Sequence, residues 1–532
     1  MVKKLIAVGA FSILLAACGD DSSSATGGDS EKTAVSLDSL VGYTQKGPFL
    51  KGSTVYLYEL SDGRTLKQTN GNFTSDITRD DGRYKFTARD LVSQYAMVVV
   101  DGYYRNEVTG ESSNAPIRLK SITDLRKRSS VNVNILTHLE YDRVYQLVTR
   151  DGMTVKEAKR TAQAEILKLF GIELDENTDA ESMDVFGASD ADAALLAISV
   201  LLQGDRKESE MKTLLSEISD AITENGKWEG ASAEAMKTQM ADWAFSHDLQ
   251  QIRKNVEGWG LNKNGEVGNF ERLIENFIAG MFGLDTCRKG ENIERQFRVE
   301  NGQSSFNGKQ YRCMDGMFVT RYEDSYFEDK PYDLMLDPRD RRVYRTVKIG
   351  DQVWMAENLN LDYKVKLKGS DEYETYGNYP EGDKVRYGRF YSWGAAMDSA
   401  GVYSNSGKGC GNRTACTPTY PVRGICPEGW HLPSNDDWET LFEAVGGKAT
   451  AGKVLKTTTG WHDGYGTDEF LFAAVGAGGA GLEDHEADFW TSVPADDASA
   501  NFVSLYIDSD AADLHNDPSD YSMSVRCVKD SE

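Results

Sequence analysis

Between residues 37 and 130, hydrophobic and polar positions alternate in short runs that are separated by turns containing Gly and Asp. Three such runs are Ser53-Thr-Val-Tyr-Leu-Tyr58, Gly82-Arg-Tyr-Lys-Phe86 and Tyr95-Ala-Met-Val-Val-Val100. A period of two gives each strand one apolar face, and several short strands at this spacing are typical of a β-sandwich. The pattern predicts an N-terminal all-β sandwich domain over residues 37–130.

From residue 131 to residue 284 the hydrophobic period changes to that of a helix. Thr154 and Glu157 have the spacing of a capping box at the start of one helix. Residues 191–202 are apolar nearly all round, which is typical of a helix inside a bundle, with Ser189 or Asp190 as its cap and Gly204 as its stop. The pattern predicts a central all-α bundle of six to eight helices.

Two further segments follow the helical region. Residues 285–331 contain two short strand-like runs with Cys287 and Cys313 at their ends, which predicts a hairpin followed by a linker. Residues 332–532 contain a hairpin pattern over 343–355 with a Gly350-Asp351 turn. In the same segment, Ser434 precedes apolar positions at helical spacing, which predicts a capped helix.

Several unusual sequence strings follow one another in this last segment. They are Val343-Tyr-Arg-Thr-Val-Lys-Ile349, Tyr387-Gly-Arg-Phe-Tyr-Ser-Trp393, Cys426-Pro-Glu-Gly-Trp-His431, Phe489-Trp-Thr-Ser492 and Ser524-Val-Arg-Cys-Val528. Together they resemble the Fibrobacter succinogenes major paralogous domain, a family of bacterial surface-protein modules, over roughly residues 335–529. The resemblance implies a C-type-lectin-like α+β fold for residues 332–532, related to the formylglycine-generating enzymes. It implies no particular ligand, because the family has no settled biochemical activity.

The N-terminus has the features of an export signal. Lys3 and Lys4 precede an apolar stretch, and Leu15-Ala-Ala-Cys18 has the form of a lipobox, so residues 1–18 are expected to be a processed signal peptide. The resemblance to bacterial lipoproteins implies lipidation of Cys18, with palmitate among its acyl chains, and an outer-membrane anchor that faces the cell surface. Residues 19–36 are rich in Asp, Ser, Gly and Thr, which predicts a flexible tether.

Six cysteines remain after Cys18, and an even number in an exported protein favours disulfides. Six cysteines allow fifteen pairings. Proximity together with the family resemblance favours Cys287–Cys313, Cys410–Cys416 and Cys426–Cys527. A structural zinc site is the alternative, although no CxxC spacing supports it.

The chain is acidic, with a formal net charge of −25 over 532 residues. This charge argues against nucleic acid as a partner, because phosphates would be repelled. Residues 457–525 contain no Lys or Arg but many carboxylates, and Asp508, Asp510 and Asp513 form the best local cluster of candidate calcium ligands. Calcium is therefore one interpretation of this run and a solvated acidic face is the other; no other cofactor is expected.

The main functional hypothesis is a non-catalytic binding or adhesion protein of the cell surface, anchored in the membrane through its lipid, with polysaccharide or surface proteins as partners. Trp461, Tyr465 and Trp490 are the ligand-binding candidates, as aromatic side chains expected to be exposed. One alternative is a structural envelope protein that contacts protein partners. A lesser alternative is a formylglycine-generating-enzyme-like oxidase, which would need free thiols at Cys410 and Cys416.

Overall fold

The computed structural model describes residues 34–126, 128–262, 266–288, 290, 292–320, 331–366, 373–376, 387–411, 414–462, 466–478 and 484–531. The expected signal peptide with Cys18, nearly all of the tether and the candidate residue Tyr465 lie outside these ranges. Within them, no helix has both the length and the apolar character that a membrane crossing requires.

The first part of the chain forms two small sheets that pack face to face. The strands are β1 (Val35–Gln45), β2 (Thr54–Leu60), β3 (Gln68–Asp76), β4 (Arg83–Leu91), β5 (Tyr95–Gly102), β6 (Ile117–Asp124) and β7 (Val133–Asn134). One sheet has the order β3-β2-β5-β6 and the other the order β4-β1-β7. Leu40 and Phe86 from the second sheet join the same buried core as Val55 and Val98 from the first. The alternating pattern of the sequence therefore does mark a two-layered β region.

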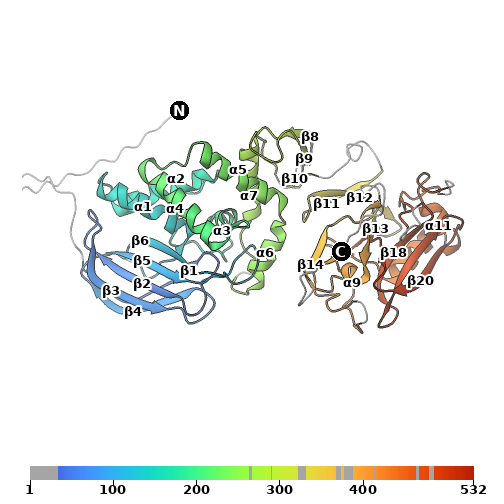
Figure 1. Cartoon of the computed structure of the whole chain (residues 1–532), viewed down its shortest axis with the longest axis horizontal. Helices are drawn as coiled ribbons and strands as arrows, with labels where there is room; N and C mark the ends of the chain where they lie inside the picture. The colour runs from blue at the N-terminus through green and yellow to red at the C-terminus, as the bar shows by residue number, and fades with distance from the viewer. Residues whose placement is uncertain are drawn as a thin grey trace, which may run out of the picture.

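Seven described helices follow these strands, as the change of period predicts. They are α1 (Ile135–Thr149), α2 (Val155–Leu169), α3 (Asp190–Gln203), α4 (Glu208–Asn225), α5 (Ala231–Ser246), α6 (Leu249–Gly258) and α7 (Phe270–Phe282). The capping box of Thr154 and Glu157 forms at the start of α2, and Ser189 caps α3, which ends at Gly204. Helices α1 and α2 pack against β6, and α4 packs against α1 (Figure 1).

The strands and helices share one continuous core. The largest hydrophobic cluster runs from Leu37 in β1 to Phe318 beyond the helices. A fully buried ion pair between Lys46, which follows β1, and Glu107 crosses this core, and the Lys46 ammonium also donates to the carbonyl of Ser199 in α3 (3.2 Å). Residues 37–130 and 131–284, which differ in hydrophobic period, are thus packed as a single unit.

A small antiparallel sheet of three strands, which contains the predicted hairpin, extends this unit. It consists of β8 (Asn292–Arg298), β9 (Gln310–Met314) and β10 (Met317–Val319). A disulfide joins Cys287 to Cys313 (Cα–Cα 5.5 Å), and Tyr311 packs edge-on against Phe245 of α5 with ring centroids 4.9 Å apart. The hairpin therefore continues the helical core and leads into the last module.

The C-terminal part is a β-rich module with short helices. Its elements are β11 (Asp333–Asp337), β12 (Arg342–Ile349), β13 (Gln352–Met355), β14 (Tyr363–Lys366), β15 (Tyr373–Tyr376), β16 (Tyr391–Ser392), α9 (Trp393–Ala396), β17 (Trp430–His431), α10 (Asn435–Ala444), α11 (Lys448–Leu455), β18 (Glu486–Pro494), β19 (Ser499–Tyr506), β20 (Ala512–Pro518), β21 (Ser522–Met523) and β22 (Val528–Lys529). The larger sheet has the order β11-β12-β13-β22-β17, and a second sheet has the order β18-β19-β20. The 343–355 hairpin forms as predicted, with Ile349 opposite Gln352.

Two runs of this module, residues 471–475 and 387–393, are rich in apolar side chains, as strands are, but form little or no strand. Residues 471–475 do not form a strand, because the backbone is left-handed at Leu471 (φ 59°) and Ala473 (φ 55°). The carbonyls of Phe472 and Ala473 accept hydrogen bonds from the buried guanidinium of Arg526 instead of from a neighbouring strand. In the aromatic run 387–393 only Tyr391 and Ser392 are paired as a strand.

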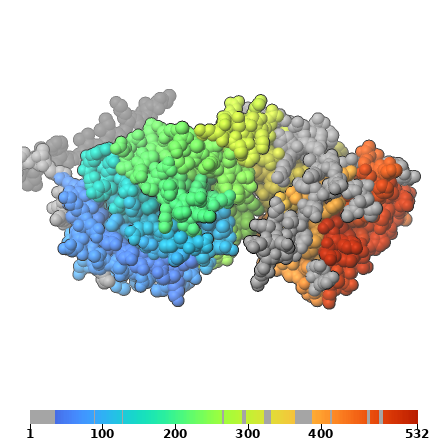
Figure 2. Space-filling model, viewed as in Figure 1, coloured from blue at the N-terminus to red at the C-terminus, as the bar shows by residue number. Residues whose placement is uncertain are grey.

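The N-terminal unit and the C-terminal module form two lobes in Figure 2. They meet at Arg341, whose guanidinium forms a buried ion pair with Glu275 of α7 (2.5 Å) and lies over the ring of Phe245. Beside this pair, Met314 and Val319 from the hairpin pack against Val343 of β12. The contact between the lobes is thus partly apolar and partly ionic.

Candidate functional site

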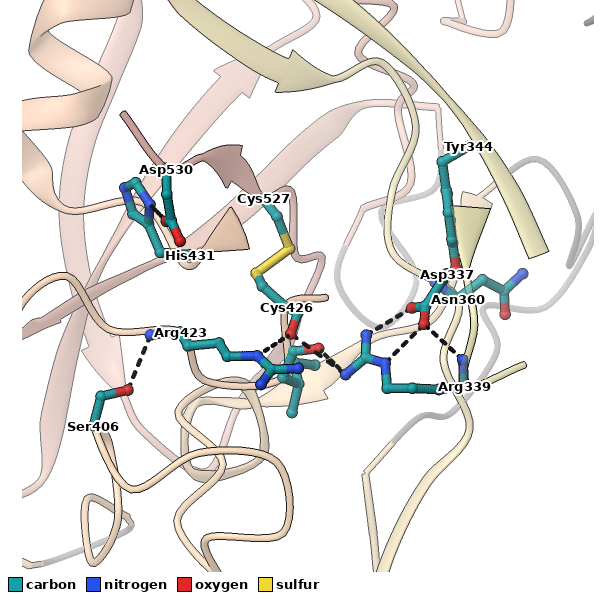
Figure 3. The surroundings of a disulfide bond; sticks show 11 residues. Asp337, Arg339, Tyr344, Asn360, Ser406, Arg423, Cys426, His431, Cys527 and Asp530 are labelled. Carbon is teal, nitrogen blue, oxygen red and sulfur yellow. Dashed lines mark hydrogen bonds and ion pairs between the residues drawn. A yellow bond between two sulfur atoms is a disulfide. The ribbon is translucent and has the colours of Figure 1, made fainter. Parts of the chain in front are cut away.

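The centre of the C-terminal module is the disulfide between Cys426 and Cys527, which are both fully buried and have a Cα–Cα distance of 5.9 Å (Figure 3). The Arg339 guanidinium donates to the carbonyl of Ile425 (2.8 Å) and is itself held by the carboxylate of Asp337 (2.6 Å). Arg423 donates to the Cys426 carbonyl (3.1 Å). The bonds of Arg339 hold the loop before β17 against the turn between β11 and β12, and the bond of Arg423 closes the same loop on itself.

The structure contains the three disulfides that proximity and resemblance favoured: Cys287–Cys313, Cys410–Cys416 and Cys426–Cys527. The first closes the hairpin of the N-terminal unit, the second closes a loop after α9, and the third joins the two ends of the C-terminal core. Cys410 and Cys416, the thiols that the oxidase alternative needs free, are bonded to each other.

His431 next to this disulfide has two carboxylate partners that sequence inspection missed. Its Nδ1 lies 2.6 Å from Asp530 Oδ1, and its Nε2 lies 3.4 Å from Asp437 Oδ2 (Figure 3 shows Asp530). Burial by itself would lower the pKa of His431, but the hydrogen bonds and charges of Asp437 and Asp530 outweigh burial and raise it. Asp437 also completes the capping box of Ser434 at the start of α10. His431 therefore ties this helix to the C-terminal tail.

Two of the tryptophans expected at the surface are inside the module. Trp490 is fully buried and donates its indole N–H to the carbonyl of Tyr391 (2.7 Å). Trp461 is only 5% exposed, and its N–H bonds to the carbonyl of Ala474 (3.2 Å). The expectation of exposure is wrong, because an indole whose N–H finds a backbone acceptor can bury its whole ring without an unsatisfied donor. Neither ring offers a face to a ligand.

The exposed aromatic residues of the module are tyrosines. Among its described residues, the large hydrophobic side chains at the surface are Tyr420 (50% exposed) and Tyr521 (55% exposed). The Tyr420 hydroxyl donates to the carbonyl of Ser492 (3.4 Å), at the end of β18, and Tyr521 lies in the turn between β20 and β21. The sequence does offer a signal for both, because each lies in a short polar loop beside Pro or Asp rather than in a strand.

Both tyrosines belong to the end of the module where α9 begins. The indole of Trp393 donates to the carbonyl of Thr491 (2.8 Å), next to the Ser492 carbonyl that Tyr420 reaches. The backbone N–H of Trp393 bonds to the carbonyl of Ser519 (3.1 Å), two residues before Tyr521. The indole and the backbone N–H of Trp393 thus contact the segments next to the two tyrosine loops. Further exposed carboxylates lie at this end of the sheet, in residues Asp496, Asp497 and Asp520.

The candidate calcium ligands do not converge. Within the described part of the chain, no three His, Cys, Asp or Glu side chains come together as a metal site, and this includes Asp508, Asp510 and Asp513. The ammonium of Lys456 lies in this loop and donates to the carbonyls of Tyr506 (2.5 Å) and Ser509 (2.8 Å). The loop carbonyls thus already have a cationic donor from the chain itself. The missed signal was Lys456 itself, the residue immediately before the run without Lys or Arg.

A second acidic feature lies inside the β18–β20 sheet. Asp488 is 7% exposed and bonds to the hydroxyl of Ser504 on the adjacent strand, with Glu486 two residues away on the same face. Burial raises the pKa of Asp488, and the charge of Glu486 raises it further, while the bond to Ser504 opposes both. The Asp488 carboxyl group therefore retains its proton at higher pH than an exposed aspartate does.

Taken together, the fold and this surface describe a protein of two lobes whose C-terminal module is β-rich, closed by a long-range disulfide, and marked by exposed tyrosines beside carboxylates. Residues 347–529 match the family model described as Fibrobacter succinogenes major domain. The C-terminal module is thus a Fibrobacter succinogenes major domain, as the recurring strings predicted. No curated protein and no solved structure matches the chain.

Proposed function

We propose that this chain is a non-catalytic surface lipoprotein whose C-terminal module binds carbohydrate at the end that carries Tyr420 and Tyr521. In this proposal Cys18 is lipidated, residues 19–36 are the tether, and the anchor lies in the outer membrane with the module directed outward. The expected C-type-lectin-like fold of the module belongs to the same proposal.

The observation that carries the proposal is the exposure of two tyrosine rings on one end of a module that buries its tryptophans. An exposed aromatic ring is a stacking surface for the C–H face of a sugar, and tyrosine adds a hydroxyl that can donate and accept. The neighbouring carboxylates of Asp496, Asp497 and Asp520 are acceptors for sugar hydroxyls. Such an arrangement needs no metal ion.

A glycan array and pull-down assays on insoluble polysaccharides test this proposal with the full-length chain. We expect binding with and without calcium, weakened about 10-fold by Tyr420→Ala or Tyr521→Ala, as the loss of an interfacial aromatic anchor usually costs over 1 kcal/mol. Tyr103→Ala is the matched control, because Tyr103 is 48% exposed but lies in the N-terminal unit. Absence of binding to every glycan would remove the proposal.

A protein partner is the second candidate, and the acidic run favours it. Residues 457–525 carry no Lys or Arg, and Asp496, Asp497, Asp508 and Asp510 are exposed. A basic protein surface would match this charge. Crosslinking in intact cells at position 497 tests this candidate, and recovery of no crosslinked protein would count against it.

A further inference from the structure

The imidazole of His431 lies between two carboxylates that belong to different parts of the C-terminal module. His431 is on β17, Asp437 is in the first turn of α10, and Asp530 follows β22 at the end of the chain. Nδ1 of the ring is 2.6 Å from Asp530 Oδ1, and Nε2 is 3.4 Å from Asp437 Oδ2. Both ring nitrogens therefore face an anion, and Figure 3 shows the contact with Asp530 near the Cys426–Cys527 disulfide.

The pairing of β17 with β22 places Asp530 next to the ring. His431 is directly opposite Val528 in this antiparallel pair. Because side chains alternate between the two faces of a sheet, Asp530 lies on the same face as His431, two residues beyond Val528, and Lys529 lies on the opposite face. The backbone N–H of Asp530 donates to the carbonyl of Gly429 (2.9 Å), so the pairing continues past the strand.

The carboxylate of Asp437 is fixed by the start of α10. Its Oδ2 accepts hydrogen bonds from the backbone N–H of Ser434 (2.8 Å) and from the Ser434 hydroxyl (2.6 Å), as part of the capping box. The side chain of His431 is only 13% exposed. Charges that are partly buried are screened less by salt than exposed pairs are. Asp437 thus fixes one side of the imidazole, and Asp530 the other.

No lysine or arginine competes for these two carboxylates. Within the described part of the chain, the ion pairs of Asp437 and Asp530 are formed with His431 alone. Of the other charged side chains of α10, Asp436 is exposed and Glu439 pairs with Lys448. The charge between the two carboxylates therefore depends on one proton of the imidazole.

Only the protonated ring can donate to both carboxylates. The imidazolium has two N–H donors, whereas a neutral imidazole has one donor nitrogen and one acceptor nitrogen. An ionised carboxylate only accepts, so the acceptor nitrogen of a neutral ring would face another acceptor. Loss of the proton therefore breaks one of the two contacts and removes the charge that attracts both carboxylates.

The pKa values of these groups have the signs that this geometry requires. Burial alone would lower the pKa of His431, but Asp437 and Asp530 raise it. Burial alone would raise the pKa of Asp437, but the bonds from His431 and Ser434 lower it. The stability that His431 contributes is therefore complete below its unfolded pKa of about 6.5 and is lost as pH rises through the folded pKa. The contribution of Asp437 is complete above about pH 4, so the contact is strongest between about pH 4 and about pH 6.5.

We propose that His431 is a pH-sensitive contact of the C-terminal module: as imidazolium it joins the start of α10 to the end of the chain, and loss of its proton releases one of these two partners. The module is then most stable at mildly acidic pH, and its last residues loosen as the pH rises above neutrality. This proposal does not depend on the ligand-binding function proposed above.

Thermal unfolding of the full-length chain tests the proposal, followed by tryptophan fluorescence from about pH 5.5 to about pH 8.5, on both sides of the usual histidine pKa. The native chain is compared with His431→Gln, whose amide forms hydrogen bonds but carries no charge. Asp530→Asn is the second variant, and its side chain is exposed enough (43%) that the substitution leaves the fold intact. His515→Gln is the matched control, because His515 is in the same module but lies against the rings of Phe502 and Tyr506.

The quantity compared is the difference in thermal midpoint between the native chain and each variant at one pH, because burial also raises the pKa of Glu140 and of Asp488 to about 7. We expect the native midpoint to lie roughly 2–4 °C above that of His431→Gln at the acidic end, and level with it at the alkaline end. Asp530→Asn should show a smaller difference of the same sign, and His515→Gln should follow the native chain throughout.

Hydrogen exchange measured by mass spectrometry adds a local readout. Residues 528–531 should exchange more slowly in the native chain than in His431→Gln near pH 6, and at the same rate as in the variant near the alkaline end. Three results overturn the proposal. They are a difference between the native chain and His431→Gln that does not change with pH, a difference that grows as the pH rises, and an Asp530→Asn chain that behaves as the native chain at every pH.

Discussion

Removal of the disulfide between Cys426 and Cys527 is expected to destabilise the C-terminal module more than removal of either other disulfide. The bond closes a loop with a sequence separation of 101, whereas the separations are 26 for Cys287–Cys313 and 6 for Cys410–Cys416. A crosslink stabilises a fold mainly by restricting the unfolded chain, and this effect grows with the logarithm of loop length. The three disulfides of this chain therefore allow three loop lengths to be compared within one protein.

The chain-entropy relation gives the size of each effect. It predicts losses of about 4.7 kcal/mol for the separation of 101, about 3.5 kcal/mol for 26 and about 2.2 kcal/mol for 6 at 25 °C. Because Cys426 and Cys527 are fully buried, alanine at these positions also removes packing, so the first value is a lower bound. The gap between the long-loop and short-loop variants that comes from loop closure alone is about 2.5 kcal/mol.

Urea unfolding followed by tryptophan fluorescence measures these losses, since six of the nine tryptophans lie from Trp354 onward. We compare two double variants, Cys426→Ala/Cys527→Ala and Cys410→Ala/Cys416→Ala, with the native chain. The comparison requires that the dependence of the unfolding free energy on urea concentration is the same for all three. The single variant Cys527→Ala breaks the same bond but keeps one sulfur, so it separates packing from loop closure. If the long-loop variant lost no more stability than the short-loop variant, the reasoning would be refuted.

Three further perturbations follow from the buried charges. Burial raises the pKa of Asp488 in the folded state. Its contribution to stability is therefore complete below the unfolded pKa of about 4 and is lost as pH rises toward the folded pKa, by up to about 1.4 kcal/mol per pH unit. Asp488→Asn should flatten this part of a plot of thermal midpoint against pH, and an unchanged plot would contradict the argument. Lys456→Met should lower the free energy of unfolding in urea by about 1–3 kcal/mol, because the loop carbonyls lose their donor. Millimolar calcium should leave the thermal midpoint of the native chain unchanged, and a calcium-dependent rise would contradict the assignment of the ammonium to this loop. Lys46→Ala should cost about 3–5 kcal/mol because Glu107 would remain buried and unpaired, while Lys46→Met/Glu107→Leu should cost much less, and equal losses for the two would argue against a desolvation effect.

Local features of this fold were readable from sequence because they depend on neighbours in the chain. The capping boxes at Thr154, Ser189 and Ser434 each need only two side chains three residues apart and the backbone N–H groups of the same two residues. The hairpin through Gly350 likewise depends on an alternating pattern and a short turn. The family of the C-terminal module was also legible, since its strings recur in order.

The exposure of individual side chains and their hydrogen-bond partners could not be predicted from the sequence, because both depend on residues that are distant in the chain. The sequence shows Trp490 as an aromatic residue in a strand, but burial of its ring depends on the carbonyl of Tyr391, 99 residues away. Likewise, the carboxylate that lies nearer to His431, that of Asp530, is 99 residues further on in the chain. The exposed aromatic side chains of the module are therefore tyrosines and not the tryptophans that the sequence led us to expect.

By itself, the sequence determined the periods of the strands and helices, the positions of the helix caps and the family of the last module. Only the tertiary structure decided that the strands and helices of the first part share one core, that Lys456 and Arg526 at the two ends of the acidic run turn inward onto backbone carbonyls, and which aromatic rings reach solvent. The physical reason is that hydrogen bonding and desolvation act between side chains in space, whereas propensity and capping act between neighbours along the chain.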